Sequence, residues 1–344
     1  MNKLILVGDP GSKRTEYFTK AVDQVAQELH LSVDYQVLSW QEGTAERLRG
    51  AVVKLDPPPV FDADFLQMHH SLKGYQEHLA ALQSSAGGEP EKIRFLNSPQ
   101  AILTALDKGT CKQMLMEHGI PTTRSLCGKR IYKDIDQLHR IMCREHTYSV
   151  FLKPVDHSGA AGIVAYRWNP QREISHAYTS VCLEGNHLVH TKRIRHLTGQ
   201  EQIEPILRQL LKGEILVEKW YPKAEYRGNK YDLRVVWQFG RSAYMVGRQS
   251  KYPITNLDLN NHALPLECLQ LSGTTLQEIR QLCDDTMACF ADMSVAGIDV
   301  MLDKNTCKPR VIEVNGQGDL LHQDIYQENQ IYREQVERML AMSD

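Results

Sequence analysis

The strongest constraint on the fold is a pair of alternating segments near the carboxyl end, GIDVML at 297–302 and RVIEVNG at 310–316. Alternation of apolar and polar residues over such a short run is typical of a β-strand with one buried face. Two such segments joined by a short polar turn predict a β-hairpin. The apolar face would comprise Ile298, Val300, Leu302, Ile312 and Val314, and the opposite face Asp299, Met301, Glu313 and Asn315.

If this hairpin closes symmetrically about Thr306, Asp299 lies directly across from Glu313, with Asn315 nearby. Two carboxylates at the cross-strand separation of about 5–8 Å repel each other, so we expect something to offset their charge. Carboxylate and amide oxygens are the ligands that Mg²⁺ prefers. The hairpin therefore predicts a site for one or two Mg²⁺ ions that also bind substrate phosphates. A solvated polar face on an edge hairpin is the alternative.

Cationic residues interrupt apolar strand patterns upstream, and a phosphate-bearing substrate of Mg²⁺ would need such positive partners. Lys153 lies in VFLKP, and the glycine-rich PVDHSGAAGI that follows it could approach phosphates closely. Arg234 in YDLRVV and Arg248 in MVGRQS occupy similar positions. For each arginine taken singly, an exposed sheet edge is an equal alternative.

Taken together, these segments resemble the ATP-grasp superfamily, and most closely its RimK-type carboxylate–amine ligases. The resemblance runs from about residue 98 to 325 and rests on DKGTCKQMLMEHGIPT, FLKP, LVEKW, DLRVV, GRQS and GIDVML…VIEVNG, in that order. It implies an α/β and α+β fold in which two lobes grip ATP. The expected divisions are an amino-terminal α/β domain over 1–97, a first lobe over 98–217 and a second lobe with the metal-binding hairpin over 218–344.

The resemblance also implies a role for each motif residue. The nucleotide site would comprise Lys108, Lys153, Ser158, Gly159, Gly162, Glu218, Lys219, Trp220, Asp232 and Asn256. Within it, 218–220 would be the hinge that reads adenine, largely through main-chain groups, and Asp232 a ribose or substrate contact. The transferring phosphoryl group would be steadied by Lys153, Arg234 and Arg248, and Mg²⁺ would be held by Asp299, Glu313 and Asn315.

The implied activity is ATP-dependent formation of an amide or peptide bond through an acyl phosphate. Its partners would be ATP, a small-molecule or peptide carboxylate and an amine acceptor, and a homo-oligomer is compatible with the sequence. Two alternatives stay open: a kinase that phosphorylates a small anionic alcohol, and a non-catalytic nucleotide-binding module. If the protein were such a kinase, the basic stretch 192–196 would bind the anionic substrate. The simpler interpretation of this stretch is a strand face exposed to solvent.

Composition excludes several other classes. The 344 residues are 42% hydrophobic and 24% charged, with a net charge of −2, which describes an ordinary soluble globular protein without the basic excess of a nucleic-acid binder. The opening MNKLILVGDP is too short an apolar run for a signal peptide, and we expect a cytoplasmic protein with no membrane span. Eight cysteines without a C-x-x-C pair predict reduced thiols, and the pairs His69–His70 and His187/His190 lack a metal-ligand pattern.

The first ninety residues predict a small parallel α/β unit, with strands at 3–8, 33–38 and 51–55 and a helix at 14–30. The loop GDPGSKRT at 8–15 contains the residue types of a phosphate loop. Its spacing fits neither G-x-x-x-x-G-K-[ST] nor G-x-G-x-x-G, so we predict an ordinary strand-to-helix turn. Gly11 and Ser12, at a helix amino terminus, could still hold an anionic group of the second substrate.

Beyond residue 97 the pattern predicts helices separated by antiparallel strands. One continuous helix is expected over 98–118, and a hairpin over 181–196 is expected to turn at Gly185 and Asn186. Further helices are expected at 134–146, 200–212, 275–294 and 322–342.

Overall fold

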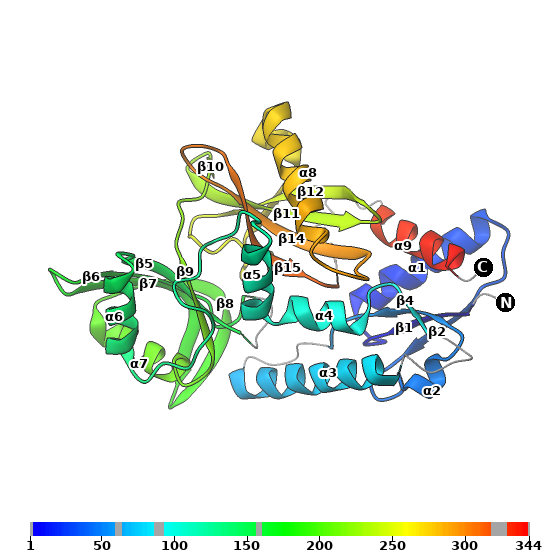
Figure 1. Cartoon of the computed structure of the whole chain (residues 1–344), viewed down its shortest axis with the longest axis horizontal. Coiled ribbons are helices and arrows are strands. Elements are labelled where there is room, and N and C mark those ends of the chain that lie inside the picture. Colours follow the sequence, from blue (N-terminus) through cyan, green and yellow to red (C-terminus); the bar gives the residue numbers. More distant parts are fainter. Residues whose placement is uncertain (1–2, 59–63, 86–92, 156–159, 318–328, 343–344) are drawn as a thin grey trace.

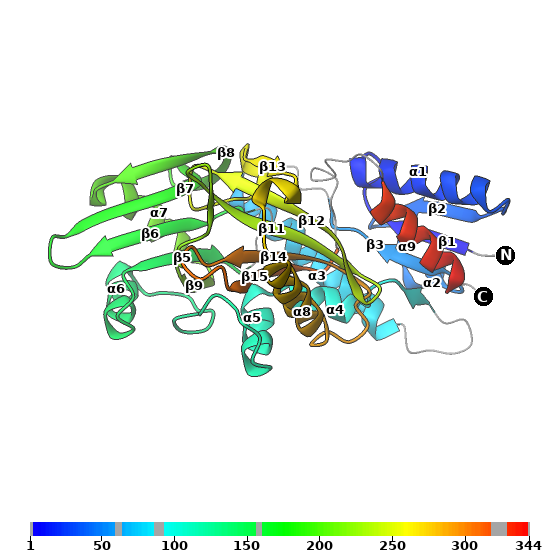
Figure 2. The same cartoon turned by 90° about the horizontal axis from the view of Figure 1, so that it is seen from above.

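The computed structural model describes residues 3–58, 64–85, 93–155, 160–317 and 329–342, which form three sheets with flanking helices. The amino-terminal sheet lies at one end of the molecule and the β5–β9 sheet at the other, with the β10–β15 sheet between them (Figures 1 and 2). The mixture of one parallel and two antiparallel sheets confirms the predicted α/β and α+β class.

The amino-terminal sheet is parallel and has the strand order β2-β1-β3-β4. Its elements are β1 (Lys3–Val7), α1 (Lys13–Glu28), β2 (Asp34–Leu38), α2 (Ala45–Leu48), β3 (Val52–Leu55), α3 (Phe65–Ser85) and β4 (Arg94–Phe95). Leu4 to Val7 are fully buried, as expected of a central strand covered on both faces. The loop at 8–15 is the ordinary turn predicted, because Ser12 caps α1 by accepting from the Thr15 N–H and the Asp9 carboxylate accepts from the Gly11 N–H.

The last helix, α9 (Gln330–Ala341), packs on this amino-terminal unit. Tyr332, Val336 and Met339 share a core with Phe18 of α1 and Leu4 of β1. The sequence division had grouped these residues with the second lobe. We propose that the amino-terminal unit comprises 1–97 together with α9, while the boundary at 217 stays a prediction. The remainder of the helix expected at 322–342 lies outside the described residues.

The helix expected over 98–118 is two helices, α4 (Pro99–Leu106) and α5 (Lys108–Glu117). Asp107 interrupts them with extended backbone angles, φ −80° and ψ 93°. Its carboxylate accepts from the N–H groups of Gly109 and Thr110, and Lys129 Nζ lies 2.5 Å from Oδ2. Helical periodicity continues through this break, so the prediction of one helix was wrong, and Asp107 starts a new helix whose first residue is Lys108.

The first lobe contains the antiparallel sheet β8-β7-β6-β5-β9. Its elements are α6 (Ile135–Arg144), β5 (Ser149–Pro154), β6 (Val164–Asn169), β7 (Ile174–Glu184), β8 (His187–Thr198), α7 (Gln200–Leu210) and β9 (Ile215–Lys219). The hairpin predicted over 181–196 is confirmed in a longer form, with Glu184 paired to His187 around the expected turn. Helices α6 and α7 pack on one face of this sheet, which leaves the other face for the interior between the lobes.

The second lobe contains the sheet β13-β12-β11-β14-β15, with β10 paired to β11. Its elements are β10 (Glu225–Tyr226), β11 (Asn229–Gln238), β12 (Arg241–Ser250), β13 (His262–Leu264), α8 (Gly273–Met287), β14 (Val295–Leu302) and β15 (Pro309–Asn315), with short 3-10 turns at Leu257–Leu259 and Leu266–Leu269. Residues of α5 and α8 pack on the face formed by Leu233, Val235 and Ile298. The other face of β11 therefore carries its alternate residues, including Asp232 and Arg234.

The predicted hairpin forms between β14 and β15, and Asp299 pairs with Glu313 as expected. The register then shifts, because Val300 pairs with Val311 and Ile312 is left as an extra residue in a β-bulge. Val311 and Val314 are the buried residues of β15, at 0% and 1% exposure. The prediction that Ile312 belongs to the apolar core face was therefore wrong, because the bulge turns Ile312 toward the interior between the lobes along with Glu313.

None of the helices in the described part of the chain is long and apolar enough to cross a membrane. The eight cysteines are free thiols.

Replacing Asp107 tests the break between α4 and α5. We expect Asp107→Ala to lower the free energy of unfolding by about 0.5–2 kcal/mol, because the cap of α5 is lost. Asp107→Asn is the matched control, since its amide oxygen can still cap the helix without the charge that pairs with Lys129. Urea denaturation measures both, and equal losses in the two variants would contradict a capping role.

Candidate active site

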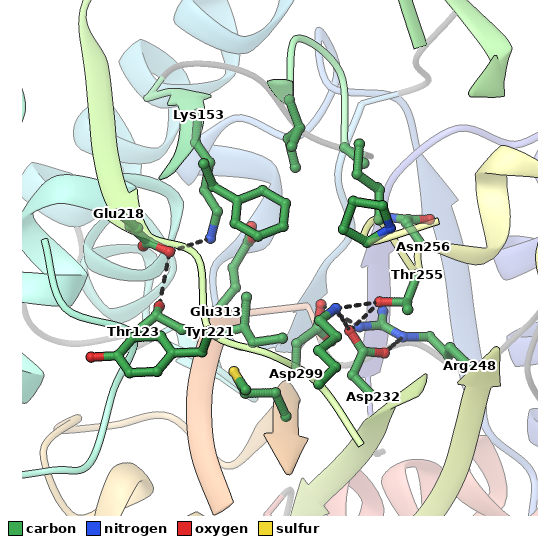
Figure 3. A pocket seen from close by; sticks show the side chains of 18 of the residues that line it. Thr123, Lys153, Glu218, Tyr221, Asp232, Arg248, Thr255, Asn256, Asp299 and Glu313 are labelled. Atoms are coloured by element: carbon green, nitrogen blue, oxygen red, sulfur yellow. Dashed lines mark hydrogen bonds and ion pairs between the residues drawn. The ribbon is translucent and has the colours of Figure 1, made fainter. Parts of the chain in front are cut away.

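A pocket of about 630 Å³ lies between the two antiparallel sheets (Figure 3). Of the residues predicted from the sequence, those lining it are Lys153, Glu218, Lys219, Asp232, Arg248, Asn256, Asp299 and Glu313. A smaller pocket of about 300 Å³ adjoins it and is lined by Lys108 together with Lys153, Glu218 and Glu313. The structure thus brings together side chains separated by up to 205 positions in the sequence.

Other predicted residues lie outside these linings. Arg234 reaches the site through Asp299, and Asn315 Nδ2 donates to the Gly297 carbonyl at 3.2 Å. Gly162 has φ +77°, and a Cβ there would lie 2.4 Å from Pro154 Cγ, so close packing in the loop requires glycine at this position. Ser158 and Gly159 lie outside the described residues.

The main chain of the predicted hinge segment, 218–220, is hydrogen-bonded to neighbouring parts of the protein. The N–H groups of Lys219 and Trp220 donate to the carbonyls of Arg124 and Ser149, at 2.8 and 3.0 Å. Trp220 packs beside Phe151 of the pocket wall, with ring centroids 5.5 Å apart. Tyr221, which the sequence did not single out, lines the pocket directly. Two aromatic side chains, Tyr221 and Phe151, therefore line the pocket beside the predicted segment.

Strand register explains the charge pattern on the second-lobe side. Asp232 and Arg234 share a face of β11, and this strand lies between β12 and β14. Asp232 is the cross-strand partner of Arg248, and Arg234 is the partner of Asp299. The register therefore places each carboxylate opposite a guanidinium, the favourable arrangement for cross-strand pairs.

These pairs join into one buried row of alternating charges. Lys223 Nζ lies 2.9 Å from Asp232 Oδ2, and Arg248 Nε lies 2.8 Å from Asp232 Oδ1. Arg248 Nη2 continues to Asp299 Oδ2 at 2.9 Å, and Arg234 Nε lies 2.6 Å from Asp299 Oδ1. Burial by itself would raise the pKa of Asp232, but the charges of Arg248 and Lys223 outweigh it and hold that pKa well below its usual range. The Asp232 carboxylate is therefore ionised at neutral pH.

A second buried cluster surrounds Glu218 on the first-lobe side. Lys153 Nζ lies 2.7 Å from Glu218 Oε2, Lys112 Nζ lies 3.2 Å from Oε1, and Thr123 Oγ1 donates to Oε2 at 2.8 Å. Burial acts to raise the pKa of Glu218, but Lys112 and Lys153 together outweigh it and lower the pKa to about 2. The carboxylate thereby holds the Lys153 ammonium at the pocket wall.

The predicted metal ligands can be judged by their chemistry. Among the described residues, no three His, Cys, Asp or Glu side chains form a group that could hold a metal ion. The predicted set contains only two carboxylates and one amide, all with hard oxygen donors, and Asp299 and Glu313 both line the pocket. Asp299 has two guanidinium partners, so a bound ion would share this carboxylate with Arg234 and Arg248. The donor set fits Mg²⁺, which is usually held by one or two carboxylates plus substrate phosphates.

Lys112, Thr123, Tyr221, Lys223 and Thr255 are pocket or near-pocket residues that sequence reasoning missed. Lys112 follows Lys108 by four residues, so helical spacing alone could have placed both on one face. Lys223 follows a proline in an irregular segment, and nothing in the local sequence indicates that its ammonium turns inward to Asp232 and Thr255.

Comparison of the whole structure with solved structures shows a shared architecture. The D-cycloserine synthetase DcsG matches with a TM-score of 0.61 at 12% identity, covering 98% of this chain and 100% of that chain. The chain has the ATP-grasp fold. The ATP-grasp ligase PsnB, in complex with a variant of its minimal precursor, Mg and ADP, matches with a TM-score of 0.57 at 14% identity, covering 100% and 99%.

The D-alanine–D-alanine ligase of Bacillus anthracis also matches, with a TM-score of 0.57 at 11% identity and coverage of 100% and 97%. A scan against family models and a search of curated proteins found no match. At these identities the comparisons show the ATP-grasp fold, and the roles of individual residues rest on the geometry of the pocket.

The Glu218 cluster predicts a specific dependence of stability on pH. A carboxyl group whose pKa falls from 4.5 to about 2 on folding stabilises the protein above pH 4.5, and this contribution is lost as the pH falls towards 2. We expect Glu218→Gln to lower the free energy of unfolding by about 3–5 kcal/mol at pH 7, because two buried lysines lose their partner. Between pH 4.5 and 2 its stability should fall less steeply than that of the wild type.

Urea denaturation at several pH values tests this expectation. Glu204→Gln is the control, because Glu204 forms an exposed pair with Arg208 that is expected to contribute little. Parallel pH curves for wild type and Glu218→Gln would show that Glu218 is not the depressed group.

Proposed function

We propose that this protein is an ATP-dependent carboxylate–amine ligase of the RimK type, which forms an amide or peptide bond and releases ADP and phosphate. The observation that carries this proposal is the charge balance around the two pockets. Among the described residues, seven cations surround four carboxylates: Lys108, Lys112, Lys153, Lys219, Lys223, Arg234 and Arg248 against Glu218, Asp232, Asp299 and Glu313. The surplus of positive charge suits a polyanion such as a nucleoside triphosphate.

The nucleotide would lie between the two sheets, with its base near 218–221 and its phosphates towards Lys108 and Lys153. Mg²⁺, bound as one or two ions, would neutralise phosphate oxygens, and Asp299, Glu313 and Asn315 would hold it. Asn256, which lines the same wall as Arg248, would contact the phosphate side. Lys153, Asp299 and Asn315 are already oriented by the contacts described above, so these groups need little reorganisation.

The chemistry then requires charge neutralisation and positioning. A substrate carboxylate oxygen attacks the γ-phosphorus, the bond to the β–γ bridging oxygen breaks, and ADP leaves with that oxygen. The amine of the acceptor next attacks the carbonyl carbon of the acyl phosphate, and phosphate leaves as the amide forms. Lys153, Arg234 and Arg248 would reduce the repulsion between carboxylate and phosphate oxygens, and no nucleophilic side chain of the protein is required.

Two of the structural neighbours bear on the kind of substrate. The D-alanine–D-alanine ligase is named for a small amino acid, and PsnB is described with a minimal precursor. We therefore propose that the carboxylate is a small molecule or a peptide, with an amine as acceptor.

A screen for ADP release with pooled carboxylates and amines, followed by mass spectrometry, tests the proposal. A condensed amide together with ADP supports the ligase. A stable phosphorylated alcohol would support the kinase instead, and ATP binding without ADP formation would indicate a non-catalytic module. Trapping with hydroxylamine, which converts an acyl phosphate into a hydroxamate, tests the intermediate directly.

Substitution of the hairpin carboxylates gives a quantitative prediction. We expect Asp299→Asn and Glu313→Gln each to lower kcat by on the order of 100-fold or more, because each removes a charge at the phosphate-transfer site. Asp285→Asn, at an exposed position on α8, and Glu204→Gln are the matched controls and should retain wild-type kcat. Near-normal ADP release by Asp299→Asn and Glu313→Gln would contradict the assignment of these residues.

A further inference from the structure

Lys112 is a buried lysine with partners on three separate elements. It lies one turn after Lys108 on α5, and the residue is only 4% exposed. Its Nζ donates to Thr123 Oγ1 at 2.8 Å and to the Ile312 carbonyl at 2.9 Å, and it lies 3.2 Å from Glu218 Oε1. Two of its three N–H donors are thus used by neutral partners, and the ammonium charge is paired with the Glu218 carboxylate. The side chain therefore acts on other protein groups.

The contacts of Lys112 with Thr123 and Glu218 determine where Lys153 lies. Thr123 accepts from Lys112 and donates to Glu218 Oε2, the same oxygen that binds Lys153 at 2.7 Å. Lys112, paired with Oε1, and Thr123, bonded to Oε2, thus hold both carboxylate oxygens of Glu218. The orientation of Glu218 in turn fixes the ammonium of Lys153 at the pocket wall (Figure 3).

The contact of Lys112 with the Ile312 carbonyl determines where Glu313 points. Ile312 is the extra residue of the bulge in β15, and an extra residue has no place in the ladder of hydrogen bonds. Its carbonyl is satisfied by Lys112. Without that donor a partly buried carbonyl would be left unpaired, and the bulge that turns Glu313 towards Asp299 would lose its support.

Glu218 and Ile312 belong to different sheets, on opposite sides of the pocket. Glu218 lies in β9 of the first lobe, whereas Ile312 lies in β15 of the second lobe. We propose that Lys112 is a positioning residue whose single ammonium holds the phosphate-side lysine, through Glu218, and the metal-side carboxylate, through the Ile312 bulge, in one fixed relation. This proposal rests on the function proposed above and assigns a role to a residue outside the predicted nucleotide and metal sets.

Lys112→Met tests the proposal, because methionine is similar in length and cannot donate. In the ligand-free protein we expect amide hydrogen exchange in both β9 and β15 to accelerate by about tenfold or more, since buried groups in both strands lose their partner. Binding of ATP should weaken by about tenfold, and the Mg²⁺ concentration needed for half-maximal ATP binding should rise.

Lys54→Met is the matched control. Lys54 is also a buried lysine paired with a carboxylate, Asp56, but it lies in β3 of the amino-terminal sheet. The control should lose global stability while keeping wild-type exchange in β9 and β15 and wild-type dependence of ATP binding on Mg²⁺. A change of the same size in Lys54→Met would mean that general destabilisation explains the effect, and the proposal would fail.

A double substitution separates positioning from the loss of a nearby charge. Thr123→Val removes the hydroxyl that links Lys112 to Glu218 and keeps every charge. If the two residues act as one unit, Lys112→Met/Thr123→Val should bind ATP about as weakly as Lys112→Met alone. Additive losses would overturn the proposal. If Lys112→Met does not fold, Thr123→Val alone still tests it, because its exchange in β9 should rise.

The outcome for the wild type separates this proposal from the proposed function. Absence of ATP binding by the wild type would refute the function proposed above. Wild-type ATP binding combined with unchanged affinity, Mg²⁺ dependence and exchange in a folded Lys112→Met protein would refute the role of Lys112 and leave the function standing.

Discussion

The pairing of buried charges across the central strand β11 is the interaction on which the site depends. Asp232 and Arg234 lie two residues apart and meet Arg248 on one neighbouring strand and Asp299 on the other. A buried charge without a partner is very costly, so the row can exist only in this register. A slip of β11 by a single residue would turn both side chains into the apolar face that packs on α5 and α8. Packing of the core and placement of the charges thus select the same register.

The same constraint explains why the pocket can receive a highly charged ligand. Its carboxylates are each held by at least one cation, and the cations outnumber them. Because these groups are oriented by strands and by each other, they would not need to reorganise when phosphates arrive. In the ATP-grasp fold the two sheets supply opposite walls, so the relation between the walls matters as much as the position of any one side chain.

Much of this arrangement could be predicted from the sequence, and the failures have identifiable causes. That Asp299 lies opposite Glu313 could be predicted from the alternation of apolar and polar residues and from a symmetric turn, because both are local properties of a hairpin. The bulge at Ile312 could not be found in this way, since one unpaired residue is visible only when the partner strand is known. The break at Asp107 was hidden because helical periodicity continues across it, and its partner Lys129 lies 22 positions away.

Lys112 and Lys223 were missed for a related reason. A lysine in a helix or an irregular segment usually lies on the surface, and only tertiary contacts with Glu218 or Asp232 show that these two are buried. Prediction from one sequence therefore found the charges that interrupt a regular apolar pattern. It did not find those whose partners come from distant segments.

The position of α9 has a consequence for biosynthesis. Tyr332, Val336 and Met339 complete the core that begins with Leu4 and Phe18, so the two ends of the chain meet in one unit (Figure 1). On the ribosome the amino-terminal strands emerge first, yet part of their apolar surface stays uncovered until the last helix has been translated. The lobes that form the pocket lie between these segments in the sequence, so they can fold during synthesis before the core shared by β1, α1 and α9 is complete.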